Sequence, residues 1–84
     1  MTEFQGKRLE DDYQWNAGMP AGAYWKAESG WFCVTPNGHY GNLSAHDVIE
    51  HENGTITVSP SILVSSADIE LWHGFLKEGV WTEC

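Results

Sequence analysis

The stretch HDVIEHENGTITVSP, from His46 to Pro60, has the pattern of a β-hairpin. Asn53-Gly54 is typical of a two-residue turn, and it separates two runs in which apolar and polar residues alternate. A two-residue loop predicts these cross-strand pairs: Glu52 with Thr55, His51 with Ile56, Glu50 with Thr57, and Ile49 with Val58. One face should then face the core and the other solvent. The expected core face carries Ile49, His51, Ile56 and Val58, and the expected solvent face carries Val48, Glu50, Glu52, Thr55 and Thr57.

The chain continues from this hairpin into a different pattern. Pro60 has no backbone N–H to donate, so we expect it to interrupt the ladder. The following Ile62-Leu63-Val64 is continuously apolar. This run predicts a strand that is covered on both faces.

The last segment, DIELWHGFLKEGVWTEC, predicts a second hairpin. Lys77-Glu78-Gly79 fits a three-residue loop, which places Phe75 opposite Trp81 and Leu76 opposite Val80. One strand face then carries Ile69, Leu71, His73 and Phe75. A helix over residues 67–77 is the competing interpretation, because Ile69, Trp72, His73 and Leu76 also share a helical face. Gly74 and Gly79 favour the strand.

Towards the amino terminus, a third hairpin is expected from residues 23–28 and 31–35 around Ser29-Gly30. In residues 1–20 the apolar residues follow neither the helical period nor the alternation of a strand. We therefore expect an irregular acidic arm with room for one short helical turn. Eighty-four residues allow a single domain, 1–84, with a β-rich core over 21–84. The fold class is therefore all-β, a small partial barrel or sandwich built from hairpins.

The charge balance is strongly acidic, with 12 Asp and Glu against 4 Lys and Arg and a net charge of −8. Direct binding to DNA or RNA normally requires a basic patch, and binding to anionic lipids requires the same, so this balance disfavours both. It is compatible with docking on a protein that has a basic surface. The candidate docking residues are Glu10, Asp11, Asp12, Glu50 and Glu52.

Five Trp, three Tyr and three Phe give this short chain an aromatic excess. Most of these rings should build the core, since each brings roughly 150–250 Å² of buriable area. A thin core with many rings also favours homo-oligomers. The alternative is that some rings stack on a nucleotide-type ligand, with a cation near its phosphates. The candidate residues for that site are Trp25, Trp31, Tyr40, Trp72 and Trp81, with Lys26 as the cation.

Two cysteines and four histidines are possible metal ligands, but their spacing does not match a zinc knuckle. A site would have to be assembled from Cys33, His39 and His73 on separate strands, so we expect no metal and no cofactor. No nucleophile elbow or phosphate-binding glycine loop is present, so we expect no enzymatic activity. The sequence also has no signal peptide or membrane-spanning pattern, which is typical of an intracellular protein.

Several segments together resemble a family of small uncharacterised proteins from phages and bacteria. These segments are GTITVSPSIL (Gly54–Leu63), WHGFLKEGVW (Trp72–Trp81), AYW (Ala23–Trp25) and PNGHYGNLSAHDVIEHE (Pro36–Glu52). The resemblance implies a phage accessory protein in the host cytoplasm that acts on a host component by binding, with a counter-defence inhibitor as the leading hypothesis. Some relatives carry a cysteine-rich stretch that looks metal-binding. Here that stretch reads TPNGHYGNL, so its thiolates are absent and only His39, with Cys33 further upstream, could replace them. The alternatives are an oligomeric protein that sequesters a nucleotide-type immune signal and a zinc-stabilised structural module.

Overall fold

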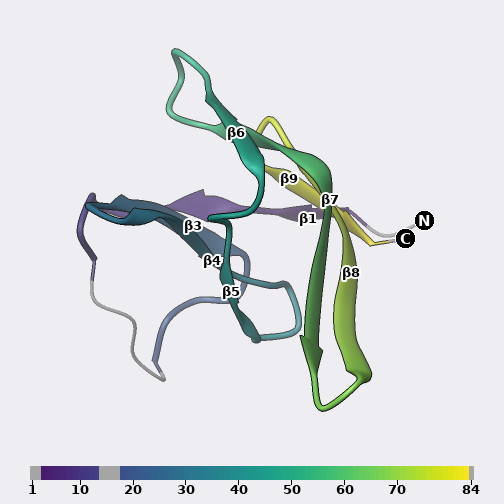
Figure 1. Cartoon of the computed structure of the whole chain (residues 1–84). Helices are drawn as coiled ribbons and strands as arrows, with labels where there is room; N and C mark the ends of the chain where they lie inside the picture. Colours follow the sequence, from purple (N-terminus) through teal and green to yellow (C-terminus); the bar gives the residue numbers. More distant parts are fainter. Residues whose placement is uncertain (1–2, 14–17, 84) are drawn as a thin grey trace.

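The chain folds into two packed β-sheets. The computed structural model describes residues 3–13 and 18–83, which form nine strands and no helix (Figure 1). The strands are β1 (Glu3–Gln5), β2 (Lys7–Arg8), β3 (Ala23–Ala27), β4 (Gly30–Val34), β5 (Tyr40–Asn42), β6 (Asp47–Glu50), β7 (Ile56–Ser66), β8 (Ile69–Lys77) and β9 (Val80–Glu83). The all-β prediction is confirmed, in the form of a sandwich-like fold that does not close into a barrel.

The first sheet has the order β1-β9-β8-β7-β6, and the second has the order β2-β3-β4-β5. β1 pairs antiparallel with β9, and β2 pairs parallel with β3, so the amino-terminal segment joins the two sheets. Only Gly6 separates β1 from β2, and its N–H donates to the Gly79 carbonyl at 2.7 Å. A Cβ atom at this position would lie 2.6 Å from that oxygen. The close approach therefore requires glycine where the chain passes from one sheet to the other.

The prediction of an irregular arm over residues 1–20 is thus wrong for Glu3–Gln5 and Lys7–Arg8, which are strands. No helical turn occurs in the described part of the arm, which excludes residues 1, 2 and 14–17. The reason lies in the partner strands. β1 pairs with the edge of β9 and β2 pairs with the edge of β3, although neither short segment has a clear hydrophobic period of its own.

The hairpin around Asn53-Gly54 forms, but its predicted register is wrong by one residue. Glu50 pairs with Ile56, and Val48 pairs with Val58. The loop contains three residues, closed by a 2.8 Å bond from the His51 N–H to the Thr55 carbonyl. A shift of one residue exchanges the two faces of a strand. Ile49 is consequently 59% exposed instead of buried, whereas Ile56 and Val58 are in the core as predicted.

The β8–β9 hairpin shows the same kind of error in the opposite direction. Its loop contains two residues, Glu78 and Gly79, and both have positive φ (48° and 80°). Leu76 therefore lies opposite Trp81, and Phe75 lies opposite Thr82. The predicted apolar face with Phe75 points outwards, while Leu76 and Trp81 are fully buried. Residues 69–77 are a strand, as favoured over the helix.

β7 is one continuous strand that runs through Pro60. Its pairing with β8 shifts between Val58 and Ile62, on either side of the proline, which agrees with the predicted interruption. The expectation that Ile62-Leu63-Val64 is covered on both faces is wrong, because Leu63 is 52% exposed. Only the face with Ile62 packs against the second sheet.

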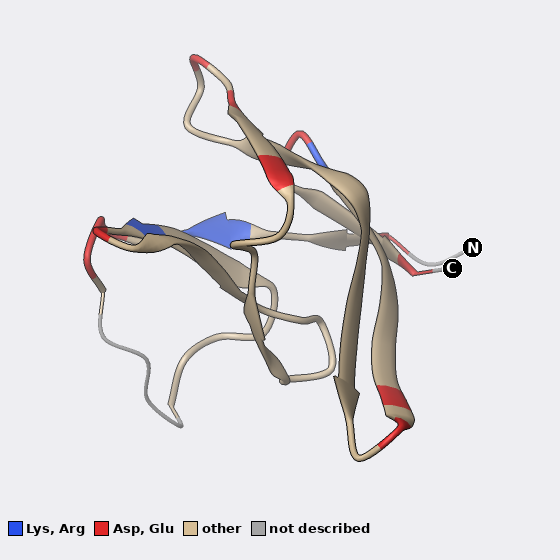
Figure 2. Cartoon of the chain, viewed as in Figure 1, with Lys and Arg blue, Asp and Glu red and all other residues tan. Residues whose placement is uncertain are grey.

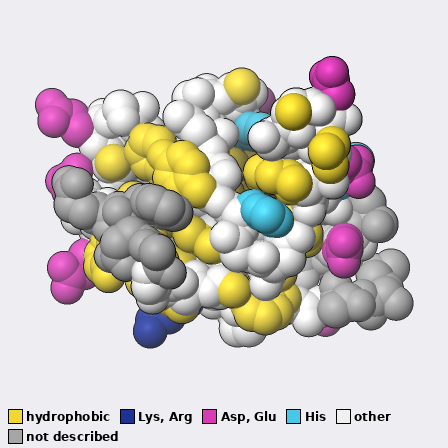
Figure 3. All heavy atoms as spheres, turned by 90° about the horizontal axis from the view of Figure 1, so that it is seen from below, with side chains coloured by type: hydrophobic (Ala, Val, Ile, Leu, Met, Phe, Trp, Pro, Cys, Tyr) yellow, Lys and Arg dark blue, Asp and Glu magenta, His cyan; other side chains and the backbone are white. Residues whose placement is uncertain are grey.

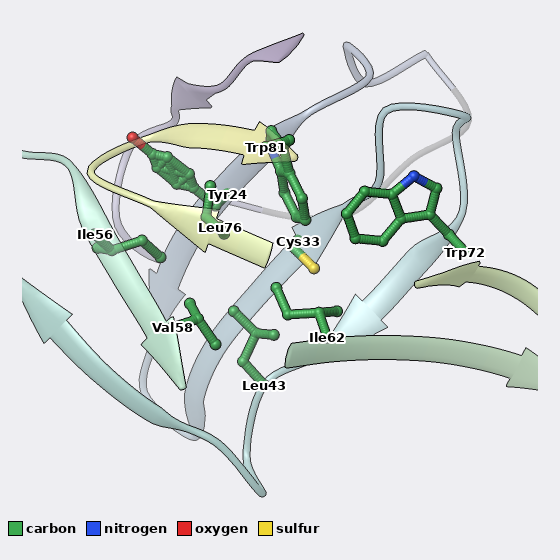
Figure 4. Packing of buried hydrophobic residues seen from close by; sticks show 9 residues of the cluster. All are labelled: Tyr24, Cys33, Leu43, Ile56, Val58, Ile62, Trp72, Leu76 and Trp81. Carbon is green, nitrogen blue, oxygen red and sulfur yellow. The ribbon is translucent and has the colours of Figure 1, made fainter. Parts of the chain in front are cut away.

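The core lies between the two sheets (Figure 4). The first sheet contributes Ile56, Val58, Ile62, Trp72, Leu76 and Trp81, the second contributes Tyr24 and Cys33, and Leu43 comes from the β5–β6 connection. Trp72 and Trp81 pack edge to face, with 5.3 Å between ring centroids. The buried indole N–H of Trp81 donates to the Gly22 carbonyl at 2.8 Å. This bond ties the first sheet to the residue before β3.

Candidate functional site

Two acidic segments that are far apart in the sequence meet at Arg8. One guanidinium nitrogen of Arg8, Nη1, donates to Glu50 Oε2 and to the Gly54 carbonyl, each at 2.9 Å. The other, Nη2, donates to Asp11 Oδ1 at 3.2 Å. The guanidinium carbon lies 4.8 Å from the centroid of the Trp31 ring. We call this group of residues the Arg8 site.

The backbone explains why these groups converge. Arg8 lies opposite Tyr24 in the parallel β2–β3 pair. The chain then follows β3, because the Asp12 N–H donates to the Lys26 carbonyl at 2.6 Å. Asp12 in turn accepts a 3.1 Å hydrogen bond from the Glu28 N–H, which fixes the far end of the segment. The loop with Gly54 comes from the other sheet, so the Arg8 site spans both.

The carboxylates of the site remain accessible while the cation between them is partly covered. The side chains of Asp11 and Glu50 are 63% and 45% exposed, whereas that of Arg8 is 24% exposed. Burial lowers the pKa of Arg8, but the hydrogen bonds to Glu50 and Asp11 outweigh that effect, so the pKa is raised above its ordinary value. Arg8 therefore stays charged and holds both acidic segments.

The predicted docking residues lie around this site as an exposed acidic rim. Glu10, Asp11, Asp12, Glu50 and Glu52 are all exposed. Figure 2 marks acidic residues at the end of the second sheet and on the β6–β7 hairpin, with basic residues between them in this view. Lys26 lies 6.0 Å from the Trp31 ring centroid, so this surface is acidic at its margin and cationic at its centre. The rim can meet a basic partner.

A shallow depression lies next to the acidic rim, lined by Asp12, Tyr13, Ala27, Glu28 and Ser29. Two of these five residues are carboxylates, and both are exposed. A depression of this composition favours a cationic group over a phosphate.

The aromatic candidates are mostly structural. Trp25, Trp72 and Trp81 are 2%, 4% and 0% exposed, so their ring faces are not available to a ligand. Trp31 is half-buried beneath Arg8, and Tyr40 is 44% exposed. Tyr40 stacks on Phe32 at 6.0 Å between centroids, and Phe32 stacks on Trp25 at 5.9 Å. The structure does not bring the five candidate rings together around one opening.

The candidate metal ligands are also dispersed. Burial raises the pKa of the Cys33 thiol to about 12, so this fully buried side chain is a neutral thiol at physiological pH. His73 Nε2 shares a 3.0 Å hydrogen bond with Ser61 Oγ. His39 contributes its backbone N–H to Thr35 Oγ1 at 3.0 Å. Within residues 3–13 and 18–83 no three His, Cys, Asp or Glu side chains lie close enough to hold a metal ion, and Cys84 lies outside the described residues.

Sequence reasoning missed one polar group, formed by Ser61, His73 and Glu70. Its order resembles a nucleophile, a base and an orienting carboxylate. However, Glu70 Oε1 is 4.0 Å from His73 Nδ1, and their side chains are 64% and 35% exposed. A hydrogen bond requires a shorter distance, and a catalytic group requires shelter from water. We interpret the Ser61–His73 bond as a cross-strand contact on the outer face of β7 and β8.

Sequence reasoning also missed the role of Arg8 itself. The sequence contains one indication of this role. Only four residues are Lys or Arg, and two of them, Lys7 and Arg8, lie just before the acidic segment.

Comparisons with protein-family models, with curated proteins and with solved structures find no match. The resemblance to small phage and bacterial proteins therefore stays a prediction. The described residues contain no helix with the length and apolarity needed to cross a membrane.

Proposed function

We propose that this chain is a non-enzymatic phage accessory protein that binds and neutralises a host protein, with a factor of host defence as the target. Binding takes place in the host cytoplasm, where the acidic rim around Arg8 meets a basic surface of the target. The observation that carries the proposal is the convergence of Asp11 and Glu50 on Arg8. That contact turns two separate acidic segments into one continuous surface.

The physical basis of the proposal is electrostatic complementarity on a fixed scaffold. A net charge of −8 attracts a basic partner over a Debye length and raises the association rate. Because Arg8 already holds the two segments in place, less conformational freedom is lost when the rim binds. Exposed carboxylates such as Glu10 and Glu52 then contribute at the edge of the interface, where charge governs specificity and rate more than affinity.

Charge reversal on the rim tests this proposal. The tagged chain and its Glu50→Lys/Glu52→Lys variant are each incubated with a lysate of the host bacterium, and the captured proteins are identified by mass spectrometry. Glu78→Lys/Glu83→Lys is the matched control, because it makes the same charge change on exposed residues of the β8–β9 hairpin and its end. We expect one host protein to be captured by the wild-type chain and by the control, and to be lost with the rim variant.

Glu52→Lys alone provides a second variant, because it leaves the contact between Arg8 and Glu50 in place. We expect it to weaken capture in the same direction, and we expect moderate salt to release the captured protein. Equal capture of the same host protein by the wild-type chain and the rim variant would reject the rim as the binding surface.

The other functions expected from the sequence receive less support. A nucleotide-binding role would have to rely on Trp31 and Tyr40, since three of the five candidate rings are buried. Self-association stays a prediction that sedimentation velocity measures.

A further inference from the structure

We propose that the free edge of β7, from Ile62 to Ser66, is where an extended segment of the partner protein adds as a strand. This segment has an apolar centre and a Lys or Arg at each end. The inference deepens the proposed function and rests on it, since it assumes a protein partner with basic character.

The two edges of β7 are paired unequally. On one edge β8 pairs with β7 as far as Ser66. On the other edge β6 pairs only with Ile56–Ser59. From Ile62 to Ser66 this second edge therefore has no strand partner among the described residues. An edge of this kind offers backbone donors and acceptors to an incoming strand.

A groove runs beside this edge. It has a volume of about 300 Å³ and lies between the edge strand β5 and the free part of β7. Its lining consists of Tyr40, Gly41, Asn42, His46, Ile62, Leu63, Val64 and Ser65. The lining has no formally charged side chain, and Leu63 within it is half-exposed. Alternate side chains of an added strand would find apolar contacts here.

His46, which lines the groove, has a ring nitrogen without a hydrogen-bond partner. His46 Nε2 lies 3.1 Å from the Ser61 carbonyl, which can only accept, so Nε2 carries the proton. In the neutral ring Nδ1 is then a hydrogen-bond acceptor. His46 Nδ1 is buried and has no partner, which is costly unless a donor arrives. A backbone N–H of the incoming segment would reach this buried atom only after the His46 ring turns towards the groove.

Charged side chains lie at the two ends of this edge and not along it. Residues 55–67 contain no charged side chain. Exposed carboxylates flank this stretch at both ends, with Asp47 opposite Ser59 and with Asp68 and Glu70 at the tip of the β7–β8 hairpin. Figure 2 marks acidic residues on β6 and at the tip of the β7–β8 hairpin. In Figure 3, which views the molecule from the side of that tip, hydrophobic and histidine side chains lie towards the centre and acidic side chains towards the margin.

This charge distribution selects the occupant. A segment with basic residues at both ends meets a carboxylate at each end of the edge. A second copy of the chain would instead bring its own carboxylates and a further net charge of −8 to the same place. Like charges placed together in this way discriminate against self-pairing. The edge therefore fits a basic segment of another protein better than it fits a second copy.

Synthetic peptides test the inference directly on the full chain. The probe is the fluorescently labelled peptide Lys-Thr-Val-Thr-Val-Thr-Val-Lys, and binding is followed by fluorescence anisotropy. Two control peptides replace both Lys by Glu or methylate alternate backbone nitrogens. We expect the Lys-flanked peptide to bind, the Glu-flanked peptide to bind about tenfold more weakly or not at all, and the methylated peptide to lose binding.

Two protein variants locate the peptide on the edge. Leu63→Lys places a cation on the free edge and should weaken binding of the Lys-flanked peptide about tenfold. Phe75→Lys is the matched control, because Phe75 is 49% exposed on the neighbouring strand and does not line the groove. It should leave the affinity unchanged. Circular dichroism of both variants verifies that each is folded, and Ser65→Lys repeats the test within the groove.

Several outcomes would overturn the inference. One is no binding of the Lys-flanked peptide, and another is equal binding of the Lys-flanked and Glu-flanked peptides. A third is equal loss of binding in Leu63→Lys and Phe75→Lys. A wild-type dimer in sedimentation equilibrium that becomes monomeric only in Leu63→Lys would assign the edge to a second copy.

Failure here is distinguishable from failure of the proposed function. If the host protein is captured equally by the wild-type chain and by Leu63→Lys, the strand site is rejected while the acidic rim stands. If peptide binding is intact but charge reversal at Glu50 and Glu52 leaves capture unchanged, the rim is rejected.

Discussion

Replacing Arg8 by Met removes the contact that joins the two acidic segments. Methionine keeps an unbranched apolar stem beside Trp31 and removes the charge and all donors. The hydrogen bond from Arg8 to the Gly54 carbonyl is partly buried and charge-assisted, and it contributes about 1.5–2 kcal/mol. Each ion pair contributes only about 0.2–1 kcal/mol, because Asp11 and Glu50 are largely solvated. The contact with the Trp31 ring adds about 0.5 kcal/mol.

These contributions overlap because they share one side chain, so we expect Arg8→Met to lower the free energy of unfolding by about 2–3 kcal/mol. Urea denaturation followed by Trp fluorescence measures this change, with an unchanged slope if the unfolded state is the same. Lys7→Met is the matched control, since it removes one positive charge from the adjacent exposed residue. It should cost less than about 0.5 kcal/mol.

An equal loss of stability in Arg8→Met and Lys7→Met would mean that the contacts of Arg8 do not stabilise the fold. A double-mutant cycle between Arg8 and Glu50 adds a sharper measurement. It should give a coupling of about 0.5–1 kcal/mol at low salt that falls as salt is added. A coupling of zero would mean that Arg8 does not hold the β6–β7 loop in solution.

Three further predictions concern the core, the hairpin register and metals. Between the ordinary pKa of 9.0 and the raised value of about 12 for Cys33, the unfolded chain ionises the thiol while the native chain keeps its proton. The free energy of unfolding should therefore fall with rising pH in that window, by up to about 1.4 kcal/mol per pH unit, and Cys33→Ala should show a shallower fall. Val48→Lys should lower the free energy of unfolding, measured by urea denaturation, by about 1–3 kcal/mol, and Ile49→Lys should lower it by less than about 0.5 kcal/mol. A larger loss in Ile49→Lys than in Val48→Lys would favour the two-residue loop. Treatment with EDTA should leave the thermal unfolding midpoint unchanged, and a decrease of several degrees would support a zinc-stabilised module.

The sequence predicts where the hairpins lie, but it does not determine their loop lengths. Asn53-Gly54 marks a turn because both residues tolerate positive φ. Whether two or three residues form the loop depends on local contacts. Asn53 Oδ1 accepts hydrogen bonds from the N–H and the hydroxyl of Thr55, at 3.1 and 2.7 Å, and these accompany the three-residue loop. A one-residue difference exchanges the two faces, so Ile49 was predicted to be buried although it is exposed.

The second register error has a similar cause. Glu78 adopts a left-handed conformation, with φ of 48°, which is unfavourable for a residue with a side chain. The residues next to Glu78 in the sequence do not predict that conformation. Packing of Leu76 against Trp81 in the core outweighs the local preference, and this packing depends on residues that only meet in the folded chain.

The candidate site was predictable in its chemistry but not in its geometry. Composition alone identifies an acidic surface around residues 10–12 and 50–52. The contact that unites them joins Arg8 and Glu50 across 42 residues of sequence, and no local pattern encodes it. The aromatic excess, by contrast, is explained mostly by the core. Trp72 and Trp81 fill the space between the sheets and Trp25 packs on the opposite face of β3 against Tyr13 and Phe32.

Amide hydrogen exchange of the full chain, alone and bound to the captured host protein, shows whether the acidic rim and the free edge of β7 contact the partner. We expect binding to slow exchange in residues 8–12 and 51–54, which carry the acidic rim, and along the free edge of β7. Slower exchange confined to β1 and β9, with the rim unchanged, would contradict this expectation.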